Sequence, residues 1–231
     1  MKHGNLTIIG TSHIAEESVR NVSETILSEK PDIVAVELDH ARLHAIFSSD
    51  KPRMSLAMLQ VMGVTGFIFF LIGGFLQRRL GKLIGAVPGQ EMKTAVEVAK
   101  QNRIRVALID LPINITMRSI SAIRASEKLK LARDLFLGVA GFEREKEQID
   151  LTKIPPGSFV EIAMKKISKR YPGLYKALVS DRNEHMARVL SRIMKIEPQS
   201  RIVAVVGAGH EKEIMRILKT MLTYKEDAPS Y

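Results

Sequence analysis

Short runs of consecutive apolar residues alternate with longer amphipathic stretches along this chain. The runs at residues 33–36, 106–109 and 202–206 predict strands of a buried parallel sheet, since both faces of such a strand are covered. A short strand at 6–9 precedes them. The stretches between them have apolar residues at helical spacing and predict helices over 16–30, 39–47, 91–101 and 211–222. The alternation indicates an α/β fold with a mostly parallel central sheet and flanking helices.

A mostly helical stretch over residues 116–195 interrupts this alternation and reads as an insertion between strands. The whole chain has 231 residues, a length that suits one domain, so we expect a single domain over 1–231. Helical spacing predicts inward-facing side chains within the helix over 16–30 and core positions within the insertion: Val19, Val22, Ile26, Leu27, Ile120, Ile123, Leu129, Leu131 and Leu135.

An uncharged stretch of 24 residues, 54–77, is long enough to cross a bilayer. Its four glycines weaken a straight span, and a span would separate candidate site residues that lie on both sides of it in sequence. We therefore expect a long apolar helical segment that packs in a homodimer or lies on a membrane surface, and single-span insertion is disfavoured. Residues 1–4 lead directly into a strand without a secretory signal, which predicts a cytoplasmic or membrane-associated protein.

Composition narrows the function classes. The chain has no Cys, which excludes disulfide scaffolds, thiol nucleophiles, Cys-based zinc sites and iron–sulfur clusters. The net charge is +10, and it is concentrated in the middle of the chain, with +6 over 51–110 and +6 over 111–180. Solvated helix faces, an anionic membrane surface or a nucleic acid would each suit this charge. Nucleic acid is the weakest of the three, because Trp is absent and aromatic residues make up only 5%.

One strand–turn–helix pattern occurs twice and places a histidine in the same position each time. Gly10-Thr11-Ser12-His13 follows the strand at 6–9, and Gly207-Ala208-Gly209-His210 follows the strand at 202–206. The carboxyl ends of parallel strands are where open α/β sheets place their ligand sites, so both imidazoles should face one cleft. Neutral imidazoles suit divalent transition metals, and carboxylates could complete the coordination. A single histidine at such a turn is more often a surface residue, but the repetition favours a site.

Charged residues near these turns supply further candidates. Glu37 and Asp110 each end a buried strand and should lie on the same edge as the histidines, and Glu91 opens a helix. Asp39 also follows the strand at 33–36, although helix capping would explain it. Arg182 could bind an anion or a developing oxyanion, or could form a plain helix salt bridge. Two familiar motifs are ruled out, because Lys212 and Ile214 stand where a dinucleotide fingerprint needs Gly and a zinc-protease helix needs His.

An ordered set of segments resembles the TraB/PrgY/GumN family, which is related to the Tiki proteins. The set covers nearly the whole chain: Gly10-Thr11-Ser12-His13; Pro31-Asp32-Ile33-Val34-Ala35-Val36-Glu37-Leu38-Asp39 with Arg42; Pro88-Gly89-Gln90-Glu91-Met92; Thr116 with Arg118; Asp181-Arg182-Asn183 with Met186-Ala187; and Gly207-Ala208-Gly209-His210. The chain departs from the family pattern at three points. Leu111 stands where the family usually has Arg, and Asp181 stands where Glu is usual. The spacing between Thr116 and Arg118 is one residue short.

The resemblance implies metal-dependent peptide hydrolysis, with manganese or cobalt favoured and zinc or iron as alternatives. His13, His210, Glu37 and Glu91 would be metal ligands, with Glu37 as an alternative catalytic base and Arg182 steadying the oxyanion. Gly10, Gly207, Asp39, Arg42 and Asp110 complete the candidate site. The PrgY branch is linked to pheromone shutdown and the Tiki branch to membranes, so a peptide is the expected substrate. A non-enzymatic protein that sequesters a peptide at a membrane surface is the rival hypothesis.

Overall fold

The computed structural model of the chain describes residues 1–11, 15–48, 89–141 and 164–223. His13 and the apolar segment 54–77 lie outside these ranges, as does part of the stretch 116–195. In the part of the chain that is described, no helix is long and apolar enough to cross a membrane.

A five-stranded sheet in the order β1-β2-β5-β3-β4 forms the centre of the fold. Its strands are β1 (Lys2–His3), β2 (Leu6–Thr11), β3 (Ile33–Val36), β4 (Arg105–Leu108) and β5 (Ile202–Gly207). All neighbours pair in parallel except β1, which pairs antiparallel with β2. Every residue of β3 and β5 is buried, as continuous apolar runs require. The predicted mixed α/β fold with a mostly parallel sheet is confirmed, and the short β1 is an addition.

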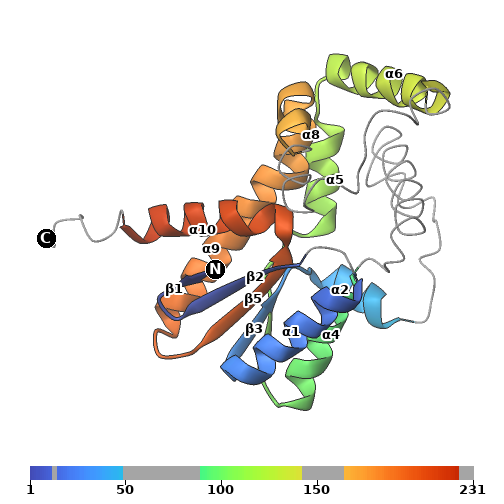
Figure 1. Cartoon of the computed structure of the whole chain (residues 1–231). Coiled ribbons are helices and arrows are strands. Elements are labelled where there is room, and N and C mark those ends of the chain that lie inside the picture. The colour runs from blue at the N-terminus through green and yellow to red at the C-terminus, as the bar shows by residue number, and fades with distance from the viewer. Residues whose placement is uncertain (12–14, 49–88, 142–163, 224–231) are drawn as a thin grey trace, which may run out of the picture.

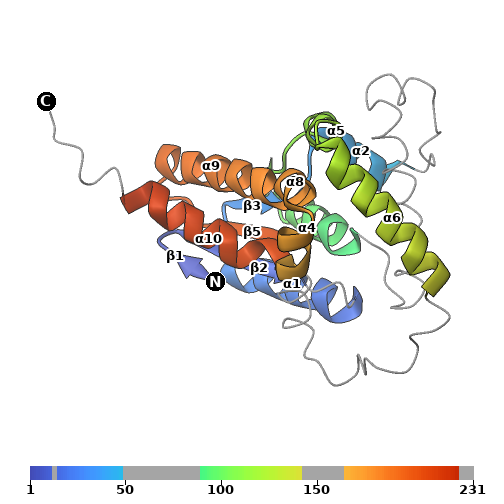
Figure 2. The same ribbon diagram turned by 90° about the horizontal axis from the view of Figure 1, so that it is seen from above.

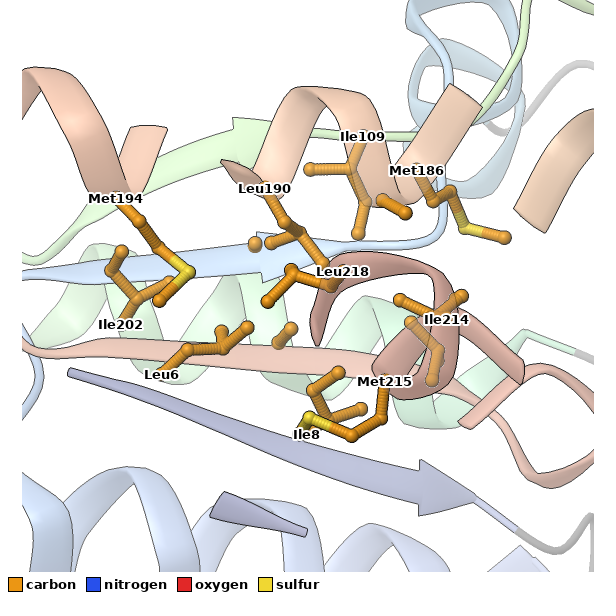
Figure 3. Packing of buried hydrophobic residues seen from close by; sticks show 14 of the residues in the cluster. Leu6, Ile8, Ile109, Met186, Leu190, Met194, Ile202, Ile214, Met215 and Leu218 are labelled. Atoms are coloured by element: carbon orange, nitrogen blue, oxygen red, sulfur yellow. The ribbon is translucent and has the colours of Figure 1, made fainter. Parts of the chain in front are cut away.

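Helices cover both faces of the sheet (Figure 1). On one face α1 (Ala15–Glu29) and α4 (Gln90–Gln101) pack over a cluster that includes Val22, Ile26, Val36 and Val205. On the other face lie α9 (Asp181–Ile196) and α10 (Ala208–Thr223), side by side when seen from above (Figure 2). Side chains from both of these helices meet the sheet in the second cluster, shown in Figure 3. Each side of the sheet thus has its own hydrophobic core.

The described elements between β4 and β5 are all helical. They are α5 (Ile113–Ser121), α6 (Ala125–Gly141), a helical stretch at 164–170, α8 (Pro172–Tyr175), the π-helical turn η1 (Lys176–Ser180) and α9. The last three form one uninterrupted helix, because Tyr175 and Ser180 at the junctions keep right-handed helical dihedral angles. Figure 1 shows α6 projecting away from the sheet beyond α5 and α8. A short helix α2 (His40–Phe47) follows β3.

Two of the predicted core positions are wrong. Leu27 is 51% exposed and Leu129 is 74% exposed, whereas Val22, Ile26 and Ile120 are buried. Leu27 follows Ile26 and points away from the sheet, since consecutive helical residues differ by about 100° in direction. Leu129 lies on α6, which projects from the body, so apolar spacing there marks no contact with either core.

Candidate functional site

Four parallel strands end at one edge of the sheet, and polar residues follow them there. Glu37 comes directly after β3, and Asp110 comes two residues after β4. Gly207 is the last residue of β5, and α10 begins at once, so that His210 lies in its first turn. The register pairs Thr11 of β2 with Gly207, which makes the two glycine turns neighbours, as the sequence predicted. His13 itself lies outside the described residues.

Glu37 is the central carboxylate of this edge. Its Oε2 accepts a hydrogen bond of 2.7 Å from the backbone N–H of Gly207, and its Oε1 accepts one from Arg182 Nη2. Oε1 also lies 3.4 Å from Nε2 of His210. Burial alone would raise the pKa of Glu37, but the positive charge of His210 in its protonated form, the charge of Arg182 and the Gly207 hydrogen bond outweigh burial and lower the pKa below 4.5. Glu37 is therefore a carboxylate at neutral pH.

Arg182 joins Glu37 to the buried carboxylate of Asp110. Its Nε donates to Oδ1 of Asp110 over 2.9 Å, and its Nη2 donates to Oδ2 over 2.7 Å. Arg42 Nη1 forms a further ion pair with Oδ2, so two guanidinium groups compensate the fully buried Asp110 carboxylate. With its Nη1 donating to the Leu178 carbonyl, Arg182 has committed four N–H groups to protein oxygens. A guanidinium has five N–H groups, so one remains for any oxyanion contact of the kind predicted for Arg182.

The π-helical turn η1 ends immediately before Asp181 and Arg182. A π turn adds one residue to the helix, and it rotates everything that follows relative to a regular α-helix. The Arg182 guanidinium reaches back to the Leu178 carbonyl within this turn at 3.3 Å. The turn therefore sets the direction in which Arg182 and Asn183 leave the helix.

His210 is held from α9 by Asn183, which is 1% exposed. Nδ1 of His210 lies 2.5 Å from Oδ1 of Asn183, and both side chains are buried. An amide oxygen only accepts, so in this arrangement Nδ1–H donates to it. Asn183 belongs to one of the segments that carry the family resemblance, but no role is predicted for it from the sequence. Only the fold shows that it contacts His210, 27 residues further along the chain.

Asp39, Glu91 and Gly10, the other candidate residues that the structure describes, have different surroundings. Asp39 caps α2, because its Oδ1 accepts from the backbone N–H of Arg42 at 2.7 Å, and its Oδ2 accepts from Ile113 N at 2.6 Å. The capping alternative thus accounts for Asp39. Glu91 is 3% exposed in the first turn of α4, whose N-terminus lies at this sheet edge because its C-terminus leads into β4. Gly10 lies against Glu211 and Ala208 at the start of α10.

Several features of this site suit a divalent transition metal. A buried imidazole with Nδ1 bound to an amide oxygen is the usual second-sphere arrangement of a metal-ligating histidine. A carboxylate lies beside it, and Gly207 leaves a gap between them, since a Cβ there would lie 3.5 Å from both Glu37 Oε2 and His210 Cδ2. Within the described ranges, however, no three His, Asp or Glu side chains gather as a ligand group. The imidazole of His210 and the carboxylate of Glu37 are ligand types that a divalent transition metal accepts. A complete set of ligands would also need residues outside the described ranges.

Comparisons with known proteins agree with the ordered motifs. The model of the TraB/PrgY/gumN family matches residues 1–221. An uncharacterized protein of Methanocaldococcus jannaschii is 31% identical over 220 residues, covering 94% of this chain and 54% of its own length. The TraB domain-containing proteins of Mus musculus and Homo sapiens are each 27% identical over 248 residues, covering 95% of this chain and 64% of their own length. The chain thus spans a little over half to about two thirds of the length of these relatives.

Proposed function

Because the chain belongs to the TraB/PrgY/gumN family, we propose that it is a metal-dependent hydrolase that cleaves a peptide at the carboxyl edge of the sheet. The observation that carries the proposal is the pair of His210 and Glu37, with Nε2 3.4 Å from Oε1 and with Nδ1 already engaged by Asn183. The peptide substrate is the one that the resemblance implies.

His210 and Glu37 would hold the metal together with His13. Glu91 does not gather with His210 and Glu37 in the described structure, so it would support the ligands without binding the metal directly. A divalent metal supplies Lewis acidity, which polarises a substrate carbonyl and activates water. Manganese or cobalt is favoured by the resemblance, and zinc or iron would also accept imidazole and carboxylate ligands. Asp110 and Arg182 support the site by keeping the Glu37 carboxylate in place.

Hydrolysis would break the C–N bond of a peptide group and form a bond from a water oxygen to the carbonyl carbon. Glu37 is the carboxylate nearest His210 among the described residues that could take the proton from that water. The proton would then pass to the leaving nitrogen, so that the products are a carboxylate and an amine. The single uncommitted N–H of Arg182 would be a cationic donor for the carbonyl oxygen.

The second candidate function is a protein that binds and sequesters a peptide without cleaving it. The commitment of both Glu37 oxygens to Arg182 and Gly207 favours this candidate, because a general base needs a lone pair directed at water. The same edge of the sheet would then bind the peptide.

A peptide library incubated with the protein, with and without added Mn²⁺ or Co²⁺, distinguishes the two. Mass spectrometry should find new peptide termini only when metal is present, and Glu37→Gln should lower their rate of formation at least ~100-fold. The control is His44→Ala, an exposed histidine on α2, which should cleave like the wild type. Saturable peptide binding with no cleavage in excess metal would contradict the hydrolase and support sequestration.

A further inference from the structure

Asn183 is buried at the start of α9 and touches the one described histidine of the candidate site. Its Oδ1 lies 2.5 Å from Nδ1 of His210, whereas its Nδ2 finds no hydrogen-bond partner among the described residues. A polar side chain that is 1% exposed and only half satisfied is costly. Among the residues that the structure describes, the contact with His210 is the one hydrogen bond of this side chain, so the reason for an asparagine here should be found in that contact.

Among the described residues, two acceptors lie beside the ring nitrogens of His210, whose neutral form has a single ring proton. Asn183 Oδ1 is 2.5 Å from Nδ1, and Glu37 Oε1 is 3.4 Å from Nε2. The carboxylate carries the larger charge, but Oε1 already accepts a hydrogen bond from Arg182, and the contact with Nε2 is long for a hydrogen bond. The short contact to Asn183 should therefore decide the position of the proton.

The orientation of the Asn183 amide follows from the same distance. Asn183 presents its Oδ1 to Nδ1 of His210 at 2.5 Å, and this short separation suits an N–H···O hydrogen bond better than an N–H···N one, because oxygen is smaller than nitrogen. With oxygen opposite Nδ1, the ring must carry its proton on Nδ1. The lone pair of the neutral ring is then on Nε2, on the side of Glu37 and of the space that Gly207 leaves.

We propose that Asn183 is a positioning residue that holds the neutral imidazole of His210 as the Nδ1–H tautomer and directs its Nε2 lone pair toward Glu37. The use of that lone pair as a metal ligand rests on the proposed function, but the tautomer does not. The inference assigns Asn183 a role through His210, with no contact of its own to a substrate.

The tautomer is measurable in the metal-free chain of 231 residues by long-range ¹H–¹⁵N correlation spectra of ¹⁵N-histidine-labelled protein. Spectra are recorded at a pH high enough that the ring shifts no longer change, and His210→Gln assigns the signals. In the wild type, Nδ1 should show the shift of a protonated ring nitrogen and Nε2 that of an unprotonated one. Asn183→Leu, which has a similar shape but no acceptor, should move the proton to Nε2, next to Glu37.

Asn183→Asp is the conservative variant, since it keeps an acceptor oxygen, and it should retain the Nδ1–H tautomer. An Nε2–H tautomer in the wild type, or an unchanged tautomer in Asn183→Leu, would overturn the proposal. If Asn183→Leu does not fold, the wild type and Asn183→Asp decide it, because Nδ1–H in both supports the proposal and Nε2–H in either contradicts it.

Metal affinity separates this proposal from the proposed function. Loss of a second-sphere partner typically lowers metal affinity 10–100-fold, so Asn183→Leu should bind Mn²⁺ or Co²⁺ more weakly by about that factor. A wild-type chain with the Nδ1–H tautomer that binds no metal would contradict the hydrolase and leave the role of Asn183 standing. A chain that binds metal with the Nε2–H tautomer would contradict the role of Asn183 alone.

Discussion

Two glycines at the carboxyl ends of β2 and β5 have different steric surroundings. A Cβ at Gly10 would lie 3.3 Å from the backbone Cα of Ala208 and would also collide with the Glu211 carboxylate. A Cβ at Gly207 would have ordinary contacts of 3.5 Å with Glu37 and His210. The first glycine therefore serves close packing of β2 against α10, and the second keeps space open inside the candidate site.

The pair Gly10→Ala and Gly207→Ala should separate stability from site function. Gly10→Ala should lower the free energy of unfolding by about 1–3 kcal/mol, because the backbone of α10 must shift. Gly207→Ala should stay within about 1 kcal/mol of the wild type, while its methyl group should weaken metal binding by filling the gap beside Glu37. Urea unfolding and metal titration of both variants test this. Equal destabilisation of the two would show that the difference in surroundings has no energetic consequence.

Arg182 is the residue on which the two buried carboxylates depend most. Its side chain is 14% exposed and pairs with Glu37 and with Asp110, whose side chain is fully buried. Removing one partner of a buried ion pair leaves an uncompensated charge and costs about 3–5 kcal/mol. Arg182→Met should therefore lower the free energy of unfolding by about that amount in urea.

The matched control is Arg188→Met on the same helix. Arg188 is 66% exposed and pairs with Glu184 at the surface, where an ion pair contributes about 0–1 kcal/mol. A loss in Arg182→Met no larger than in Arg188→Met would contradict the view that Arg182 compensates buried charge.

At the residue scale, the sequence predicted which side chains end the strands but not what they contact. Glu37, Asp110 and His210 were placed at one edge from strand periodicity and the glycine turns alone, and they do lie there. The engagement of Arg182 by two carboxylates was not predicted, because its contacts come from residues 72 and 145 positions away. Asn183 was missed for the same reason, since no local pattern marks a partner on another helix.

At the scale of elements, a polar cluster attaches α6 to Arg170 and Tyr171, which directly precede α8. The carboxylate of Asp134 on α6 accepts a hydrogen bond of 2.6 Å from the hydroxyl of Tyr171 and forms an ion pair with Arg170. The Tyr171 hydrogen bond, followed by that from Arg170, lowers the pKa of Asp134 from 3.8 to about 2. Leu129 is exposed on α6, whereas Asp134 on the same helix makes these polar contacts. The polar cluster therefore holds α6 in place.

Tyr171→Phe should raise the pKa of Asp134 from about 2 toward 3.8, because the hydroxyl is the largest cause of the lowering. A carboxyl whose pKa is lower in the folded state stabilises that state fully above the unfolded value and loses this effect as pH falls through the folded value. The wild-type contribution should therefore be complete above pH 3.8 and disappear near pH 2. Carboxyl ¹³C titration by NMR measures the shift, with Tyr175→Phe on α8 as the control. An unchanged Asp134 pKa in Tyr171→Phe would contradict the assignment.

Element positions were largely predictable, and the exceptions have physical causes. Strands β3 and β5 came from runs of buried apolar residues, and α4 from its helical spacing. The edge strand β1 was missed because two residues carry no periodicity. The π turn η1 was also missed, since its sequence Lys-Ala-Leu-Val-Ser is compatible with an ordinary helix, and the wider turn depends on the surrounding contacts.

At the scale of the whole molecule, the path of the chain assembles the site. The last strand, β5, inserts between β2 and β3, so the end of the chain brings Gly207 and His210 beside Glu37. The helices between β4 and β5 carry Arg182 and Asn183 back over the same edge. Residues from four separate parts of the sequence thus meet in one place. The sequence could predict this edge from the rule for parallel strands but not the order of the strands.

Metal binding by the metal-free chain is the measurement that tests the central claim most directly. Calorimetric titration with Mn²⁺ and Co²⁺, together with metal content by mass spectrometry, should show about one equivalent bound in the wild type. His210→Ala should remove this binding, whereas His44→Ala, at an exposed histidine on α2, should leave it intact. Binding that is absent from the wild type, or equally tight in His210→Ala, would contradict the assignment of a metal site to the His210–Glu37 edge.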